Sequence, residues 1–137
     1  GHNYPIIKHH PYQLLFHADL AIVNSGTATL ETALIGTPQI VVYHVMLGRL
    51  AYLAKKIFIK TKNISLVNIL AEKEIVKELY AHLFTTQNLT REIERILFDE
   101  KYRKQIILSY KELRDKLGKP GTSKRAAEII YEYSKLS

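Results

Sequence analysis

Short β-rich runs and stretches with helical spacing alternate along the chain, a pattern typical of α/β proteins. Leu20–Val23 is a short apolar run that predicts a strand buried on both faces, and Gln39–Tyr43 predicts a second strand. Between them, Ala28–Ile35 predicts a helix that Gly36-Thr37-Pro38 stops. The pattern therefore predicts a strand, a helix and a second strand joined by short turns, the unit from which parallel sheets are built.

The rest of the chain adds a third predicted strand and several helices. About Ile64–Val67 is short and β-leaning, and Ile69–Leu83 follows it with helical spacing. Further helices are predicted at Tyr12–Phe16, Thr86–Leu97 and Glu100–Leu117, and from Thr122 or Ser123 to about Leu136. These strands are fewer than a complete doubly wound nucleotide-binding domain has. The predicted fold class is therefore α/β, with a partial Rossmann-like parallel sheet and a helical C-terminal section.

The composition is that of a single globular domain. The chain has 137 residues, of which 47% are hydrophobic and 24% are charged. It contains no cysteine, which excludes disulfides and thiolate chemistry and suits a reducing compartment. No apolar run is long enough to span a bilayer, and no signal-peptide pattern opens the chain.

The net charge of +7 is unevenly distributed, because the segment Arg49–Lys62 is basic and contains no acid. Such a segment can meet nucleic acid, anionic lipid or a phosphorylated substrate. No recognised nucleic-acid module accompanies it, so a nucleic-acid partner is not predicted. Its helical spacing leaves two interpretations open. The helix either packs on the sheet with a solvated basic face, or lies at a membrane interface or the mouth of a lipid cleft.

The turn Asn24–Thr27, between the first strand and its helix, is the strongest candidate for a binding site. Its side chains are too small to cover the N–H groups at the helix N-terminus, where unpaired donors and the helix dipole favour an anion. Glu31 lies about one helical turn after Thr27, so its carboxylate is expected near the same mouth. A phosphate at the turn and a sugar hydroxyl at Glu31 would suit this layout. Ordinary helix capping is the alternative.

Two further groups of polar residues have both a functional and a structural interpretation. Asn68 stands where the third predicted strand gives way to a helix. Parallel sheets place ligand-contacting groups at such positions, although Asn is also a good N-cap. His9, His10 and His17 invite a metal hypothesis, but no set of residues with ligand spacing joins them, so no metal site is predicted.

Four segments carry a resemblance to a known enzyme family. The stretch Asp19–Pro38, with its string Ser-Gly-Thr-Ala-Thr-Leu-Glu, closely resembles the signature of lipid-A-disaccharide synthases, which are GT-B glycosyltransferases. Three more segments resemble family segments in order and spacing: Val42-Tyr43 with Leu53–Lys55, Ser65–Ala71 and Gly121–Ala127. The resemblance covers the chain from about Tyr12 onward.

The resemblance implies a donor site for a UDP-linked sugar. Enzymes of this family transfer the sugar of UDP-2,3-diacylglucosamine to 2,3-diacylglucosamine 1-phosphate (lipid X), and no cofactor or metal is implied. The turn would meet the diphosphate through backbone N–H groups, Glu31 would hold the ribose hydroxyls, and Asn68 matches a donor-site residue. The implied nucleotide-sugar-binding residues are Ser25, Gly26, Thr27, Ala28, Glu31 and Asn68.

The chain also departs from the family pattern. The N-terminal domain with the proposed acid/base residues and a Pro-Gly-Ser-Arg loop are missing, so no catalytic residue is assigned here. Val67 replaces the usual Pro before Asn68, and Ala81 replaces a Gln expected to contact the donor. Residues 1–137 are therefore interpreted as part of the C-terminal, donor-binding domain of a two-domain enzyme, inactive by itself.

The resemblance and the basic segment together imply a location and partners. The parent enzyme is expected in the cytoplasm, peripheral to the inner membrane of a Gram-negative bacterium, with an anionic membrane surface as a partner. Sheet edges exposed in a partial domain allow a homodimer. Two alternatives stay open. The chain is part of another UDP-sugar GT-B enzyme or an epimerase, or it is a non-catalytic module that binds anionic membranes through its basic helix.

Overall fold

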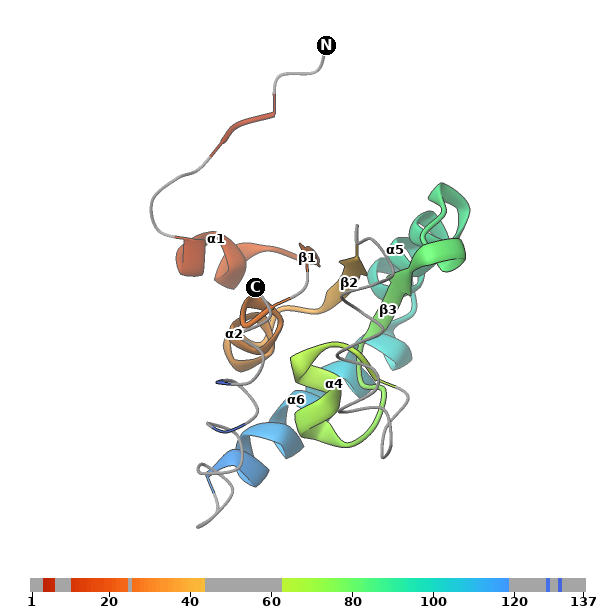
Figure 1. Cartoon of the computed structure of the whole chain (residues 1–137). Helices are drawn as coiled ribbons and strands as arrows, with labels where there is room; N and C mark the ends of the chain where they lie inside the picture. The colour runs from red at the N-terminus through yellow and green to blue at the C-terminus, as the bar shows by residue number, and fades with distance from the viewer. Residues whose placement is uncertain are drawn as a thin grey trace.

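The computed structural model describes residues 4–6, 11–24, 26–43, 63–118, 128 and 131. These residues form an α/β fold around a three-stranded parallel sheet with the order β1-β2-β3 (Figure 1). The strands are β1 (Ala21–Asn24), β2 (Gln39–Tyr43) and β3 (Lys77–Tyr80). The predicted fold class, with its partial Rossmann-like parallel sheet, is confirmed.

The first part of the fold is the predicted strand–helix–strand unit. Helix α2 spans Ala28–Ile35, as predicted, and ends at Gly36, whose φ of 101° lies in the left-handed region that glycine favours. β1 begins slightly later than predicted and pairs with β2 from Ala21, which lies opposite Gln39. The short helix α1 (Pro11–His17) precedes β1 and packs against α2.

β1 is more exposed than its apolar sequence predicts. Val23 is buried, but Ile22 is 50% exposed, since β1 is an edge strand within the described sheet. The prediction that this strand is buried on both faces is therefore wrong. The central strand β2 is the fully enclosed one, with Ile40 and Val41 both completely buried.

The predicted strand at Ile64–Val67 is also wrong. Leu66 begins a helix, α4 (Leu66–Ala71), and the side chain of Ser65 caps it by accepting a hydrogen bond from the N–H of Asn68. All residues from Ile64 to Leu70 are buried, so the apolar run reflects burial in the core rather than a place in the sheet. A short apolar run does not by itself distinguish these two arrangements.

The predicted helix Ile69–Leu83 is replaced by three shorter elements, which are the end of α4, strand β3 and the 3-10 helix η1 (Ala81–Leu83). β3 pairs in parallel with β2, from Lys77 opposite Ile40 onward. Pairing with a strand far away in the sequence therefore overrides the helical spacing of this segment.

The two C-terminal helices agree with the prediction. Helix α5 (Thr86–Phe98) is capped by Thr85, and helix α6 (Glu100–Leu117) is capped by Asp99. Figure 1 shows α1 and α2 near β1, with α5 beside β2 and β3. Buried side chains from α2, β2, α4, β3, α5 and α6 and from the segments beside them form the core. Its members that are at most 3% exposed are Ala33, Ile40, Val41, Tyr43, Leu66, Val67, Val76, Leu79, Ile96, Ile106, Tyr110 and Leu113.

Two arginines of α6 hold the strand–helix–strand unit. The Arg103 Nη1 group donates a hydrogen bond to the Asp19 carbonyl just before β1, at 2.8 Å. The Arg114 Nη1 group donates to the Leu34 carbonyl at 3.1 Å, in the last turn of α2. Carbonyl groups at a helix C-terminus lack intrahelical partners and favour a cation. α6 therefore restrains α2 from its C-terminal end.

Several predicted features lie outside the described residues, namely Ser25, His9, His10, the basic segment Arg49–Lys62 and the motif Gly121–Ala127. Of the last predicted helix, Glu128 and Tyr131 are described, and both are helical. No helix in the described part of the chain combines the length and the hydropathy that crossing a membrane requires.

Candidate functional site

The turn between β1 and α2 requires glycine at position 26. The φ of Gly26 is 131°, a backbone conformation that L side chains rarely adopt. A Cβ atom built on Gly26 would meet no heavy atom of the described residues within 4 Å, so the requirement comes from the backbone conformation and not from packing. Space therefore remains open over the backbone at this end of the sheet.

Hydrogen bonds from Thr29 orient the peptide unit between Gly26 and Thr27. The Gly26 carbonyl accepts from the Thr29 N–H at 3.3 Å and from Thr29 Oγ1 at 2.9 Å. Because the peptide unit is planar and trans, its N–H, which belongs to Thr27, points the opposite way, out of the helix. Thr27 and Ala28 are both exposed. The backbone donors at this turn therefore face the surface.

The side chain of the N-cap residue does not bind the backbone donors of this turn. Thr27 is the N-cap of α2, and its side chain makes no capping hydrogen bond. The Thr27 carbonyl accepts from the N–H groups of Leu30 and Glu31, and the Gly26 carbonyl accepts from that of Thr29, so the helical pattern begins without the N–H groups of Thr27 and Ala28. The capping alternative is therefore not realised by Thr27.

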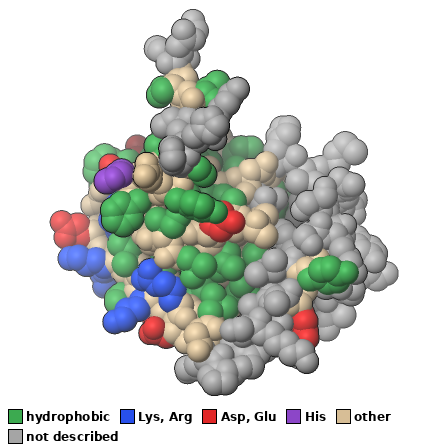
Figure 2. Space-filling model, turned by 90° about the vertical axis from the view of Figure 1, so that its left-hand side faces the viewer, with side chains coloured by type: hydrophobic (Ala, Val, Ile, Leu, Met, Phe, Trp, Pro, Cys, Tyr) green, Lys and Arg blue, Asp and Glu red, His purple; other side chains and the backbone are tan. Residues whose placement is uncertain are grey.

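Glu31 lies on the first turn of α2 with an exposed side chain. The Tyr12 hydroxyl, on α1, donates to Glu31 Oε2 at 3.4 Å, which is a long contact. Figure 2 views the side on which α1 and α2 lie in Figure 1, and hydrophobic side chains gather on that surface. Exposed apolar side chains of α1 include Leu14 and Phe16. The exposed carboxylate of Glu31 thus lies within reach of α1 through Tyr12.

Asn68 lies in the first turn of α4 and is completely buried. Its Oδ1 atom accepts hydrogen bonds from the N–H groups of Ile75 at 2.8 Å and Val76 at 3.1 Å. Its Nδ2 group donates to the Val76 carbonyl at 2.9 Å and to the Glu78 carboxylate at 2.8 Å. Both polar ends of the amide are therefore engaged within the chain. Asn68 is not the N-cap of α4, since Ser65 has that role.

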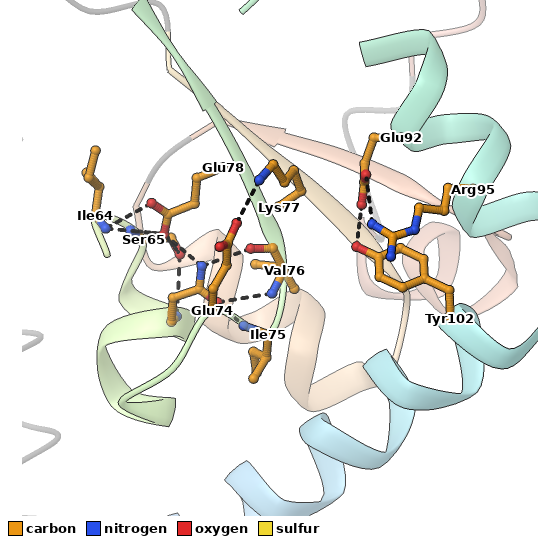
Figure 3. A network of polar contacts seen from close by, with 11 residues as sticks. Ile64, Ser65, Glu74, Ile75, Val76, Lys77, Glu78, Glu92, Arg95 and Tyr102 are labelled. Carbon is orange, nitrogen blue, oxygen red and sulfur yellow. Dashed lines mark hydrogen bonds and ion pairs between the residues drawn. The ribbon is translucent and has the colours of Figure 1, made fainter. Parts of the chain in front are cut away.

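The carboxylate of Glu78 on β3 is the centre of this network (Figure 3). Besides the Asn68 amide, it accepts from the N–H groups of Ile64 at 3.0 Å and Ser65 at 2.8 Å, and from Ser65 Oγ at 2.6 Å. Glu78 is only 6% exposed, and burying a carboxylate is costly unless it is hydrogen-bonded. These donors offset that cost. The network ties β3 to the start of α4.

The sequence-predicted site residues thus fall into two separate groups. Gly26, Thr27, Ala28 and Glu31 lie together at the start of α2. Asn68 belongs to α4, which packs against α2, but no hydrogen bond among the described residues joins it to the turn. Glu78 was not singled out from the sequence. Its local sequence gives no signal that would single it out, because the charged residue Lys77 stands directly before it in β3.

A second polar cluster joins α5 to α6 (Figure 3). The Tyr102 hydroxyl donates to the carboxylate of Glu92, and the Arg95 guanidinium lies 3.7 Å above the centre of the Tyr102 ring. Burial, followed by this hydrogen bond, raises the pKa of the Tyr102 phenol above its ordinary value. The cluster locks the two helices together.

No group of metal-ligating side chains is assembled within the described part of the chain. His17 lies at the end of α1, with its ring at 5.3 Å and edge-on to that of Phe16. The polar chemistry of the described site therefore consists of backbone donors at the turn and the Glu31 carboxylate.

Comparison with known proteins adds to this geometry. A family model described as lipid-A-disaccharide synthetase matches residues 1–132. A lipid-A-disaccharide synthase of Syntrophus aciditrophicus is 44% identical over 132 residues, which are 96% of this chain and 34% of that protein. The lipid-A-disaccharide synthase of Acidobacterium capsulatum is 36% identical over 86% of this chain and 30% of that protein. That of Anaeromyxobacter dehalogenans is 40% identical over 82% of this chain and 29% of that protein. The chain thus spans about a third of the length of these relatives, and it belongs to the lipid-A-disaccharide synthetase family.

Proposed function

We propose that this chain is the donor-nucleotide-binding part of a two-domain glycosyltransferase. The parent enzyme would transfer 2,3-diacylglucosamine from its UDP conjugate to 2,3-diacylglucosamine 1-phosphate, forming the lipid A disaccharide. Family membership supports the pathway, because the relatives are named lipid-A-disaccharide synthase. The catalytic base would belong to the other domain, so the chain alone would bind the nucleotide without turning it over.

The observation that carries the proposal is the turn at Gly26. Its left-handed φ of 131° and the inward Gly26 carbonyl turn the Thr27 N–H toward the surface, and Thr27 does not cap the helix with its side chain. Backbone donors at the positive end of a helix suit a diphosphate. In the parent enzyme, Ser25, Gly26, Thr27 and Ala28 would stabilise the negative charge that grows on the departing UDP.

Glu31 and Asn68 enter the proposal in different ways. Glu31 is exposed one turn into α2, so its carboxylate would accept hydrogen bonds from the ribose hydroxyls of a nucleotide seated on the turn. Asn68 is buried and fully bonded, so it would contribute to the donor site by holding α4 in place. No metal or cofactor takes part in this scheme.

The same proposal includes a location and lipid partners. The acceptor and the donor both carry acyl chains, so the parent enzyme would work at the cytoplasmic face of the inner membrane. The acid-free basic segment Arg49–Lys62 would favour an anionic lipid surface. Nucleic acid is not a proposed partner. The edge of β1 could also pair with a second copy and form a homodimer.

Calorimetric titration with UDP tests the nucleotide site directly. The 137-residue chain should bind UDP weakly and saturably, and Glu31→Ala should raise the Kd about tenfold or more, as expected for the loss of a hydrogen bond to a charged group. Glu94→Ala is the matched control, because Glu94 is an exposed glutamate on α5. Equal UDP binding by wild type and Glu31→Ala, or no binding by a chain shown to be folded by circular dichroism, would contradict the proposal.

The alternative, a membrane-binding module, predicts different results for vesicle sedimentation and for UDP binding. Such a module would sediment with anionic vesicles, lose that property in Lys55→Glu/Lys56→Glu and remain indifferent to UDP. A donor-binding domain should respond to UDP and to Glu31→Ala whether or not vesicles are present. A related GT-B enzyme or epimerase would share the UDP response and differ in the sugar donor that it accepts.

A further inference from the structure

We propose that Gln39 is a positioning residue for the diphosphate-binding turn and acts through Thr29, with Tyr110 of α6 as the support behind it. This inference rests on the proposed nucleotide site. It assigns a function to a series of buried, hydrogen-bonded polar residues that leads from α6 through β2 to the first turn of α2. The members do not touch the nucleotide; they set the direction of the backbone donors that would.

Thr29 is the member next to the turn. It is completely buried, and its N–H and Oγ1 both donate to the Gly26 carbonyl. This carbonyl shares its peptide plane with the Thr27 N–H, so fixing one direction fixes the other. Glycine at position 26 permits the required φ but also many others. Thr29 therefore selects the conformation in which the Thr27 N–H faces outward.

Gln39 restrains Thr29 through a hydrogen bond from β2 to α2. It is the first residue of β2 and is completely buried, and its Nε2 group donates to the Thr29 carbonyl at 2.8 Å. Its Oε1 atom has no hydrogen-bond partner among the described residues. An apolar side chain of similar size would fill the same space but could not donate to Thr29. The useful property of Gln39 is therefore its donor.

Tyr110 completes the support. Its side chain is completely buried in the core, and its hydroxyl accepts a long hydrogen bond of 3.4 Å from Gln39 Nε2. α6 contacts α2 near its other end as well, where Arg114 donates to the Leu34 carbonyl. α2 is thus anchored to α6 at both ends, and the end that carries the turn is anchored through Gln39.

The test compares the binding of UDP with the binding of uridine, which has the ribose and base but no phosphate. Gln39→Met and Thr29→Val remove the two donors while preserving side-chain size, and Thr29→Ser restores the hydroxyl. Thr37→Val is the matched control, because Thr37 is also buried and its Oγ1 donates to the Leu15 carbonyl at 2.6 Å, away from the turn. NMR titration of the 137-residue chain gives each Kd.

Gln39→Met and Thr29→Val should raise the Kd for UDP about three- to tenfold, the range of one neutral hydrogen bond, and leave that for uridine unchanged. Thr29→Ser should bind UDP like the wild type. Thr37→Val should lower the melting temperature without changing the ratio of the two Kd values. Glu31→Ala, by contrast, should weaken both ligands, because both contain the ribose.

Three results would overturn the inference. Unchanged UDP binding in both Gln39→Met and Thr29→Val would show that the turn needs no such support. Equal weakening of UDP and uridine would show a general loss of structure. In either case the proposed function survives if Glu31→Ala still weakens UDP. Failure of the wild-type chain to bind either ligand would remove the nucleotide site itself, and with it both proposals. If Gln39→Met does not fold, Thr29→Val and Thr29→Ser decide the question alone.

Discussion

The side-chain amide of Asn68 forms hydrogen bonds with several backbone groups at once. The two N–H groups bonded to its Oδ1 belong to Ile75 and Val76, which directly precede β3. Its Nδ2 group satisfies the Val76 carbonyl and one oxygen of Glu78. A carboxamide suits this position because it offers both an acceptor and a donor. An apolar residue would leave polar groups of the core without partners.

Asn68→Ala should therefore lower the free energy of unfolding by about 2–4 kcal/mol, because two N–H groups and a buried carboxylate lose a partner. Urea denaturation of the chain gives this value. Asn88→Ala is the control, since the Asn88 side chain makes one hydrogen bond, to the Leu83 carbonyl, in a partly buried position. Asn88→Ala should lower the free energy of unfolding by about 1 kcal/mol. Equal losses in the two variants would mean that the Asn68 network contributes no more than a single bond.

At the residue scale the sequence indicated that Asn68 mattered but not what it contacts. The hydrogen-bond partners Ile75, Val76 and Glu78 lie 7, 8 and 10 residues further along the chain. Their approach depends on the turn between α4 and β3, which no local pattern specified. Gly26 is the opposite case, because its conformation follows from its identity in a tight turn.

At the scale of elements, three of the helices that were predicted correctly, α2, α5 and α6, have a local end signal. Thr85 and Asp99 cap α5 and α6 through their own side chains, and Gly36 ends α2 in a left-handed conformation. α4 and β3 have weaker local signals. Ser65 caps α4 but was read as part of a strand, and β3 became recognisable only through its pairing with β2.

Gly36→Ala should destabilise the chain by about 1–2 kcal/mol through backbone strain alone, because φ is positive and a Cβ atom would meet nothing within 4 Å among the described residues. Gly118→Ala is the matched control at a helix end, where φ is −74° and the nearest backbone oxygen is at an ordinary 3.6 Å. It should be neutral or stabilising by up to about 1 kcal/mol. Thermal unfolding measures both, and a smaller loss for Gly36→Ala than for Gly118→Ala would refute the argument.

At the scale of the whole molecule, the buried Tyr110 and the partly buried Tyr102 couple stability to alkaline pH. Burial raises the pKa of Tyr110, and burial and the hydrogen bond with Glu92 raise that of Tyr102. Below the ordinary tyrosine pKa of about 10, the folded and unfolded chains both keep these protons. Above it, the unfolded chain releases them first, so stability falls as the pH rises toward the folded-state values.

Tyr110 should contribute roughly 1.4 kcal/mol of lost stability at about pH 11 relative to neutral pH, and Tyr102 should contribute less because solvent reaches it. Tyr110→Phe and Tyr102→Phe should each remove their own share of this decline, and the double variant should remove both. Denaturation curves collected at several alkaline pH values provide the measurement. A decline of unchanged steepness in the double variant would assign the alkaline effect to other groups.

Local sequence accounts for the parts of this protein that have local causes. These are α2 and its turn, β2, α5, α6 and the family to which the chain belongs, since capping side chains, glycine conformations, apolar spacing and motif strings all act over a few residues. Contacts between distant parts of the chain account for the other features. Whether residues 77–80 form a strand, how exposed β1 is, and which groups Asn68, Glu78 and Gln39 contact depend on residues distant in sequence. These arrangements follow from pairing and burial, which a local pattern of residues does not contain.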